Sequence, residues 1–90
     1  MLSFNNHPIV SDDVLGCKLL ADEATFGAVQ FSIGPTILSD VLHGRNPVHH
    51  YDNLKLCDRE RPCIEAACRH AFAVRPSARI DLEPSDFRAK

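Results

Sequence analysis

Two stretches of alternating apolar and polar residues, separated by one short loop, place the strongest constraint on how this chain folds. Residues 14–21, VLGCKLLA, and residues 28–33, AVQFSI, repeat with the period of two that is typical of half-buried strands. The loop between them, DEATFG at residues 22–27, contains polar residues and a glycine. Together they predict an antiparallel hairpin. Its expected inward-facing residues are Leu15, Cys17, Leu19, Val29, Phe31 and Ile33.

A further strand is predicted near the end of the chain. Residues 78–82, ARIDL, alternate again, with Ala78, Ile80 and Leu82 facing inward. The residues that follow, Glu83 to Asp86, are interpreted as a turn. At the other end of the chain, the segment LSF at residues 2–4 is a candidate short edge strand.

Two short helices are predicted between the hairpin and the middle of the chain. Residues 35–43, PTILSDVLH, begin with a proline and precede Gly44, which suits the end of a helix. Asn46 and Pro47 repeat the start signal of a cap followed by proline. The expected inner faces are Ile37, Leu38, Val41 and Leu42 in the first helix, and Val48, Tyr51, Leu54 and Cys57 in the second.

Pro62 decides how the next helical segment is divided. A proline deep inside a helix costs about 3 kcal/mol, but the first turn tolerates it. We therefore expect Asp58 to cap a third helix that begins at Arg59 and ends before Pro76. The alternative is that residues 47–75 form one long helix kinked near residue 58. The predicted buried stripe of the third helix is Ile64, Ala67, Cys68, Ala71 and Phe72.

The order of these elements is β-β-α-α-α-β, which places the chain in the α+β class. We expect residues 1–90 to form a single domain. In it, an antiparallel sheet is covered on one face by two or three helices. The sheet consists of the hairpin and the C-terminal strand, with the N-terminal edge strand as a further candidate.

Several segments resemble a family of short bacterial proteins described only as a domain of unknown function, of the DUF 1488 type. The segments are LSFNN at residues 2–6, the hairpin, CDRERPCIEAACRHAF at residues 57–72, and IDLEPSDF at residues 80–87. The resemblance implies an α+β domain with an antiparallel sheet and helices packed on it. It brings no activity, cofactor or catalytic residue. Pro62 and the pair His49 and His50 depart from the usual pattern of the family.

Composition narrows the class of protein. The chain is 44% hydrophobic with a formal net charge of −2, so it is not disordered and has no strong field for nucleic acid or anionic lipid. Its first residues lack a basic head and an unbroken apolar stretch, and no run is long enough for a membrane-spanning helix. We therefore expect a cytoplasmic protein with no membrane association.

The four cysteines are expected to be reduced thiols in that compartment. A zinc site could draw on Cys57, Cys63, His49 and His50, but the cysteine spacings contain no C-x2-C knuckle. Cys63 and Cys68 would lie roughly 140° apart around a shared helix. Small core or surface cysteines are therefore the favoured interpretation.

Cys63 is the best candidate nucleophile, because a thiol in the first turn of a helix near Arg59 and Arg61 favours the thiolate. A base such as His49 or His50 would have to fold back toward it. An ordinary exposed cysteine is the interpretation we favour.

Arg59, Arg61 and Arg69 could form a basic face for nucleic acid, together with Arg75 and Arg79. Acidic Glu60 and Glu65 interrupt that face, and Glu65 can pair with Arg69 one helical turn away. A solvated helix surface is the simpler interpretation.

No phosphate-binding, dinucleotide-binding, metalloprotease or nucleophile-elbow motif occurs in the chain. We therefore predict no enzyme activity, no catalytic residue, no cofactor and no metal. The first hypothesis is a non-enzymatic interaction or accessory domain that binds an unknown protein partner or itself, through its helices or an exposed sheet edge. The alternatives are a weak nucleic-acid-associated regulator, and a thiol or zinc site.

Overall fold

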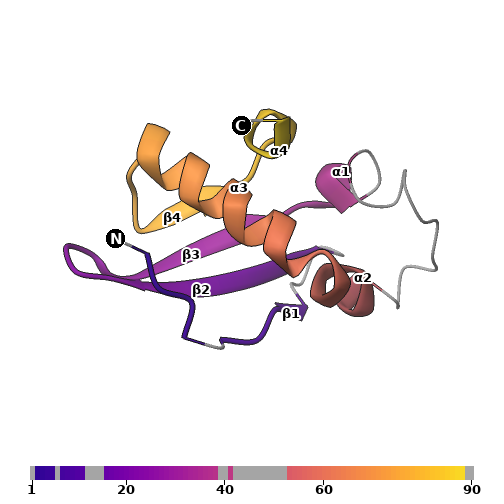
Figure 1. Ribbon diagram of the computed structural model, residues 1–90, viewed down its shortest axis with the longest axis horizontal. Helices are drawn as coiled ribbons and strands as arrows, with labels where there is room; N and C mark the ends of the chain where they lie inside the picture. Colours follow the sequence, from indigo (N-terminus) through magenta and orange to yellow (C-terminus); the bar gives the residue numbers. More distant parts are fainter. Residues whose placement is uncertain (1, 6, 12–15, 39–40, 42–52, 89–90) are drawn as a thin grey trace.

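The computed structural model describes residues 2–5, 7–11, 16–38, 41 and 53–88, and it confirms the α+β class. A twisted sheet carries one long helix, α3, across one of its faces (Figure 1). The described elements are β1 (Val10–Ser11), β2 (Cys17–Glu23), β3 (Gly27–Ile33), α1 (Pro35–Ile37), α2 (Asn53–Arg59), α3 (Arg61–Val74), β4 (Arg79–Asp81) and α4 (Pro84–Arg88).

The predicted hairpin is confirmed. β2 and β3 pair antiparallel from Cys17 opposite Ile33 to Glu23 opposite Gly27. The turn is shorter than the predicted loop, because the Glu23 carboxylate accepts the backbone N–H groups of Thr25 at 2.6 Å and Phe26 at 2.9 Å. Gly27 closes it at φ 81°, a conformation that favours glycine. The described inward residues are buried as predicted, whereas Leu15 lies outside the described part of the chain.

The sheet is mixed, so the expectation of a wholly antiparallel sheet is wrong for its last strand. Its order is β1-β2-β3-β4, and β4 runs parallel to β3, with Phe31 opposite Ile80. The chain leaves β3, passes through the helices and re-enters the sheet in the same direction, which is the crossover that a parallel pair requires. Ile80 and Leu82 are buried as predicted, but Ala78 is exposed.

The N-terminal edge is built differently from the predicted strand at residues 2–4. Within residues 2–4, Ser3 alone pairs with β2, through mutual backbone hydrogen bonds with Asp22 at 2.9 and 2.7 Å. The regular edge strand is β1, which pairs with β2 through Val10 and Ser11. Leu2 and Phe4, on either side of Ser3, are buried in the core. The N-terminal segment therefore contributes apolar side chains beneath α3.

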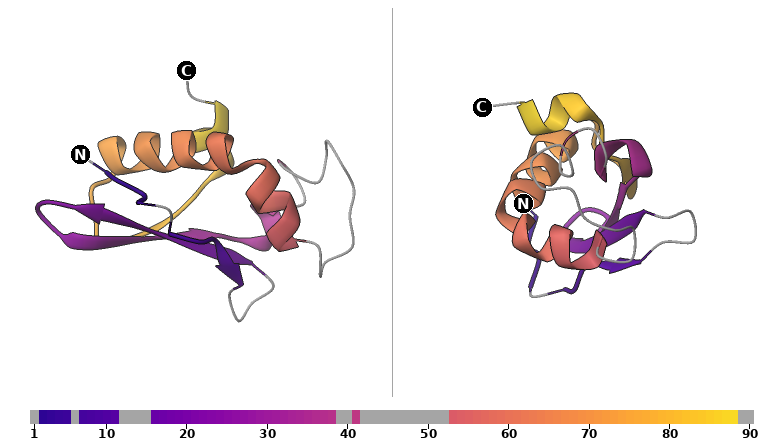
Figure 2. Two further views of the ribbon diagram at one scale, coloured as in Figure 1. Left: turned by 60° about the horizontal axis from the view of Figure 1, so that its bottom comes forward. Right: turned by 90° about the vertical axis from the view of Figure 1, so that its right-hand side faces the viewer.

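The segment around Pro62 forms two helices. α2 continues through Arg59, and Glu60 is the N-cap of α3, so the predicted cap at Asp58 and helix start at Arg59 are two residues too early. Pro62 lies in the first turn of α3, where it is tolerated. The two helix axes point in different directions (Figure 2). The predicted stripe is confirmed: Ile64, Ala67, Cys68 and Ala71 are buried, and Phe72 is partly buried against the core.

The remaining helices are short. In α1 the described helix covers Pro35–Ile37, and Ile37 and Leu38 are buried while Val41 packs against the core. The predicted start of the second helix at residues 46–52 lies outside the described residues, as does Leu42. The predicted turn over Glu83 to Asp86 is wrong, because Pro84 opens α4 and Asp86 lies in its first turn.

Candidate functional site

The two flanks of α3 face different surroundings. Beside its buried stripe, His70 lies on the flank that packs against α4, whereas Arg69, Phe72 and Ala73 lie toward the N-terminal segment. Figure 2 shows α4 on one side of α3 and the N-terminal segment on the other. Each flank carries a group of side chains that could bind a ligand or take part in chemistry. One group is mainly apolar, and the other is polar and charged.

On the N-terminal flank lies a hollow of about 430 Å³, lined by Leu2, Arg69, Phe72 and Ala73. Its volume falls within the range of about 300–1,000 Å³ that small-ligand sites occupy. Apolar side chains supply most of the lining, and one guanidinium supplies the charge. Such a hollow accommodates an apolar group beside an anionic one.

Aromatic side chains hold the surroundings of this hollow in place. The Cζ atom of Arg69 lies 4.9 Å from the centroid of the Phe4 ring. The Phe4 ring in turn packs against the buried Phe31 ring, with 6.4 Å between the two ring centroids. Phe72 meets the half-exposed Phe26 of the hairpin turn edge-to-face at 5.8 Å. The guanidinium of Arg69 is therefore positioned by a cation–π contact.

Arg69 has no acidic partner in the described part of the chain. No carboxylate among those residues lies within ion-pair distance of its guanidinium, although Glu65 is one helical turn away. Glu65 instead accepts from Nε of Arg61 at 2.7 Å. The predicted pairing of Glu65 with Arg69 is therefore wrong, and within the described residues the contact that is seen for the Arg69 guanidinium is with the Phe4 ring.

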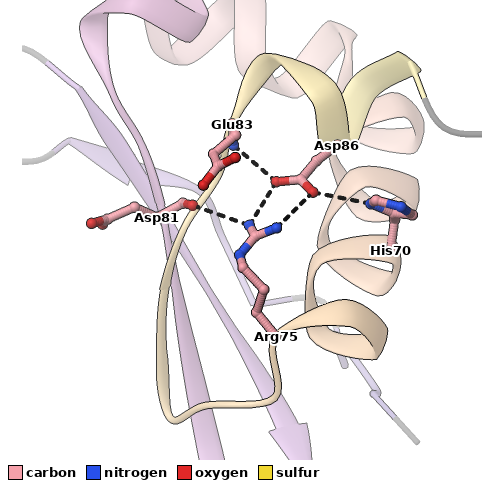
Figure 3. Close-up of polar contacts among 5 residues, drawn as sticks. All are labelled: His70, Arg75, Asp81, Glu83 and Asp86. Atoms are coloured by element: carbon pink, nitrogen blue, oxygen red, sulfur yellow. Dashed lines mark hydrogen bonds and ion pairs between the residues drawn. The ribbon is translucent and has the colours of Figure 1, made fainter.

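On the α4 flank, Asp86 forms the centre of a polar cluster (Figure 3). Its side chain is fully buried, and it receives two hydrogen bonds from Arg75, Nη1 to Oδ1 at 3.2 Å and Nη2 to Oδ2 at 2.8 Å. His70 Nδ1 lies 3.0 Å from Oδ1, and the Glu83 N–H donates to Oδ2 at 2.9 Å. Arg75 also donates to the Asp81 carbonyl at 3.4 Å.

The charges in this cluster compensate one another. Burial by itself raises the pKa of Asp86, but hydrogen bonds from Arg75, the Glu83 amide and His70 outweigh it and hold that pKa below its ordinary value. The hydrogen bond to Asp86 raises the pKa of Arg75. Asp86 therefore remains an ion that ties the end of α3 to the start of α4.

A buried carboxylate behind an imidazole is also how hydrolases orient a catalytic histidine. Here, however, both oxygens of Asp86 are also bonded to Arg75, and none of the contacts in Figure 3 brings a hydroxyl or a thiol to His70. The arrangement can hold two helices together. The contacts shown contain no nucleophile for it to activate.

The structure separates the cysteines proposed for a thiol or zinc site. Cys57 is buried in α2 and its thiol is hydrogen-bonded to Cys17, whereas Cys63 lies half-exposed in the first turn of α3. His49 and His50 lie outside the described residues. Among the residues that are described, no three His, Cys, Asp or Glu side chains gather in a way that could hold a metal ion.

The arginines proposed for nucleic acid are distributed over α2, α3 with its C-cap, and β4, where Arg79 is exposed, and three of them have contacts of their own. Arg61 pairs with Glu65, Arg69 lies over Phe4, and Arg59 lies in the last turn of α2, a different helix. Arg75 is bound to Asp86.

Sequence reasoning missed both flank sites. The sequence analysis predicts a turn at Asp86, although proline followed two residues later by an acidic residue is a recognised pattern for the start of a helix. The bonds from His70 and Arg75 join α3 to α4, and no local pattern reports them. The hollow depends on where Leu2 meets α3, which the periodicity of either segment does not specify.

Comparison with known proteins places no family name on this arrangement. No family model, curated protein or solved structure matches the chain. Among the residues described, none of the helices combines the length and apolarity needed to cross a lipid bilayer.

Proposed function

We propose that this chain is a non-enzymatic interaction domain that binds a segment of another protein in the hollow beside α3. The segment presents a bulky apolar side chain next to a carboxylate. The observation that carries the proposal is that Arg69 lies at an apolar hollow, fixed over Phe4, with no carboxylate partner among the described residues.

The two edge strands of the sheet, β1 and β4, support binding in the hollow over pairing of a strand with a partner. β4 has three residues, with exposed Arg79 and Asp81 in it, and its backbone is partly occupied. The Arg79 N–H donates to Ser77 Oγ at 3.3 Å, and the Asp81 carbonyl accepts from Arg75. At the other end β1 has two residues. Short, charged edges discourage strand addition.

The chemistry of the hollow defines the partner segment. Leu2, Phe72 and Ala73 offer apolar surface, so they favour an aliphatic or aromatic side chain. A guanidinium recognises a carboxylate through two parallel N–H donors, and stacking on a ring leaves those donors free at its edge. An apolar residue followed by Asp or Glu satisfies both requirements.

A pair of labelled peptides tests the proposal. The first is a fluorescent, acetylated Leu-Leu-Glu tripeptide amide, and the second differs only by Gln in place of Glu. Fluorescence anisotropy should show that the Glu peptide binds about fivefold more tightly, because a partly exposed charge pair contributes ~1 kcal/mol. The preference should weaken with added salt.

Matched protein variants locate the binding. Arg69→Gln should remove the preference for the Glu peptide, whereas Arg79→Gln, which removes an exposed arginine from β4, should leave it unchanged. Equal affinity of both peptides for the wild-type protein would contradict the proposal. Light scattering of the protein alone identifies self-association, and a dimer that excludes the peptide from the hollow would replace the partner proposed here.

A further inference from the structure

Two of the buried cysteines contact each other. Cys17 is the first residue of β2, and Cys57 lies in α2, far along the chain from it. Their side chains are 1% and 0% exposed, and the Cys57 thiol is hydrogen-bonded to Cys17. The other two cysteines differ: Cys68 is buried in α3, and Cys63 is half-exposed.

We infer that Cys17 and Cys57 form a reversible disulfide that links α2 to the sheet. The inference stands on the placement of the two thiols: they come from separate elements, meet inside the core and are sealed from water. A bond there requires little rearrangement of the packed core, because the two buried thiols are already within hydrogen-bonding reach of each other. It is independent of the hollow beside α3.

The reaction is a thiol–disulfide exchange with a low-molecular-weight disulfide, such as glutathione disulfide. One cysteine loses its proton to water, and its thiolate attacks one sulfur of glutathione disulfide, which releases one glutathione. The thiolate of the second cysteine then attacks the mixed disulfide and releases the second glutathione. Two protein thiols are oxidised to one disulfide, and one glutathione disulfide is reduced to two glutathione molecules.

Burial makes this exchange slow in the intact fold. The hydrogen bond to Cys17, and then burial, raise the pKa of Cys57, and only the thiolate attacks a disulfide. Exchange therefore requires α2 to open from the sheet. Cys63 reacts without such an opening, so its modification should come first and should not need denaturant.

Once formed, the bond closes a long loop of the chain. Cross-linking distant residues reduces the freedom of the unfolded chain and so stabilises the folded one. The oxidised protein should unfold at a higher urea concentration than the reduced protein, and dithiothreitol should reverse the shift.

The test uses the full chain carrying Cys63→Ser, which removes the exposed thiol. The protein is incubated with glutathione disulfide, with and without a low concentration of urea, then unfolded and alkylated. Mass spectrometry should show the loss of two hydrogen atoms and two fewer alkylated thiols, and urea should accelerate the change. Digestion should yield one cross-linked pair of peptides that contains Cys17 and Cys57.

Two further variants complete the design. Cys57→Ala in the same background should abolish the internal bond, whereas Cys68→Ala, a matched buried cysteine, should leave it intact. The peptide map of the unsubstituted chain gives the same answer without any variant. Cys17 and Cys57 that both remain alkylated after prolonged exposure, with only Cys63 modified, would overturn the inference.

Discussion

The two flanks of α3 carry charged groups that differ in burial and in charge compensation. On the α4 flank, Asp86 is fully buried, and Arg75, His70 and the Glu83 amide compensate its charge. On the N-terminal flank, Arg69 is exposed at an apolar hollow and, among the residues with a described position, contacts a ring and no carboxylate. Both flanks belong to one helix, and each presents a polar residue of α3, Arg69 on one side and His70 on the other.

The difference separates a polar group that stabilises the fold from one that we propose serves binding. Among the described residues, Asp86 is the one buried polar or charged side chain. A buried ion is tolerated only when its partners are present, so the contacts of Asp86 hold the fold together. An exposed cation without an acidic partner contributes little to folding and can contribute to recognition.

The largest expected effect on stability comes from removing Asp86, the centre of the polar cluster on the α4 flank. Asp86→Ala removes a buried carboxylate, leaves Arg75 without its partner and removes the acceptor for the Glu83 N–H. We expect a loss of about 3 kcal/mol in the free energy of unfolding, at the lower end for a broken buried pair because Arg75 is partly exposed. Urea unfolding followed by circular dichroism measures it. A loss within about 0.5 kcal/mol would place this site among ordinary surface positions.

Substituting one arginine on each flank sharpens the comparison. Arg75→Gln leaves the Asp86 carboxylate without its bidentate partner, so we expect it to cost about 2 kcal/mol. Arg69→Gln removes an exposed side chain and one cation–π contact, so we expect a cost of about 0.5 kcal/mol. Both variants are measured in the same urea titration. Equal costs would show that the two flanks are not different in kind.

Phe72 tests the hollow without touching a charge. Phe72→Ala should reduce stability by about 1.5 kcal/mol, roughly half the cost for a fully buried phenylalanine, because its ring is only partly buried. It also removes the edge contact with Phe26 and should weaken binding of the Leu-Leu-Glu peptide. Anisotropy on the folded variant measures the affinity. Unchanged affinity would show that the ring is not part of the binding surface.

The contribution of the α4 flank to stability should also depend on pH. The pKa of Asp86 is lowered in the folded protein, so its contribution to stability is fully present above the unfolded value of about 3.9. That contribution is lost as the pH falls through the folded value, which lies lower still. Asp22 and Glu23 also have lowered pKa values, so the wild-type curve is compared with that of Asp86→Asn. The difference between the two urea midpoints should shrink between about pH 5 and pH 2. A constant difference would contradict the assignment.

The local parts of the fold were predictable from the sequence. Val29, Phe31 and Ile33 face the core because the period of a strand is two, and Ile64, Ala67 and Cys68 do so because the period of a helix is 3.6. Pro62 indicated a break because a proline cannot donate the hydrogen bond that a helix interior needs.

The features that the sequence did not predict depend on segments that meet across the fold. The direction of β4 follows from the path of the crossover, which alternation within residues 78–82 does not encode. α4 is too short to show a period, so its local signals are Pro84 at its start and Asp86 in its first turn. The same holds for the two flanks: Arg75 and Asp86 pair across two helices, and Leu2 completes a hollow formed mainly by α3.

A nitrogen-15 chemical-shift titration with the Leu-Leu-Glu peptide tests the central distinction between the flanks most directly. The largest changes should fall on the amides of Leu2, Arg69, Phe72 and Ala73, while those of His70 and Asp86 stay in place. Changes centred on α4 and the His70 flank, or spread evenly over the sheet, would contradict it.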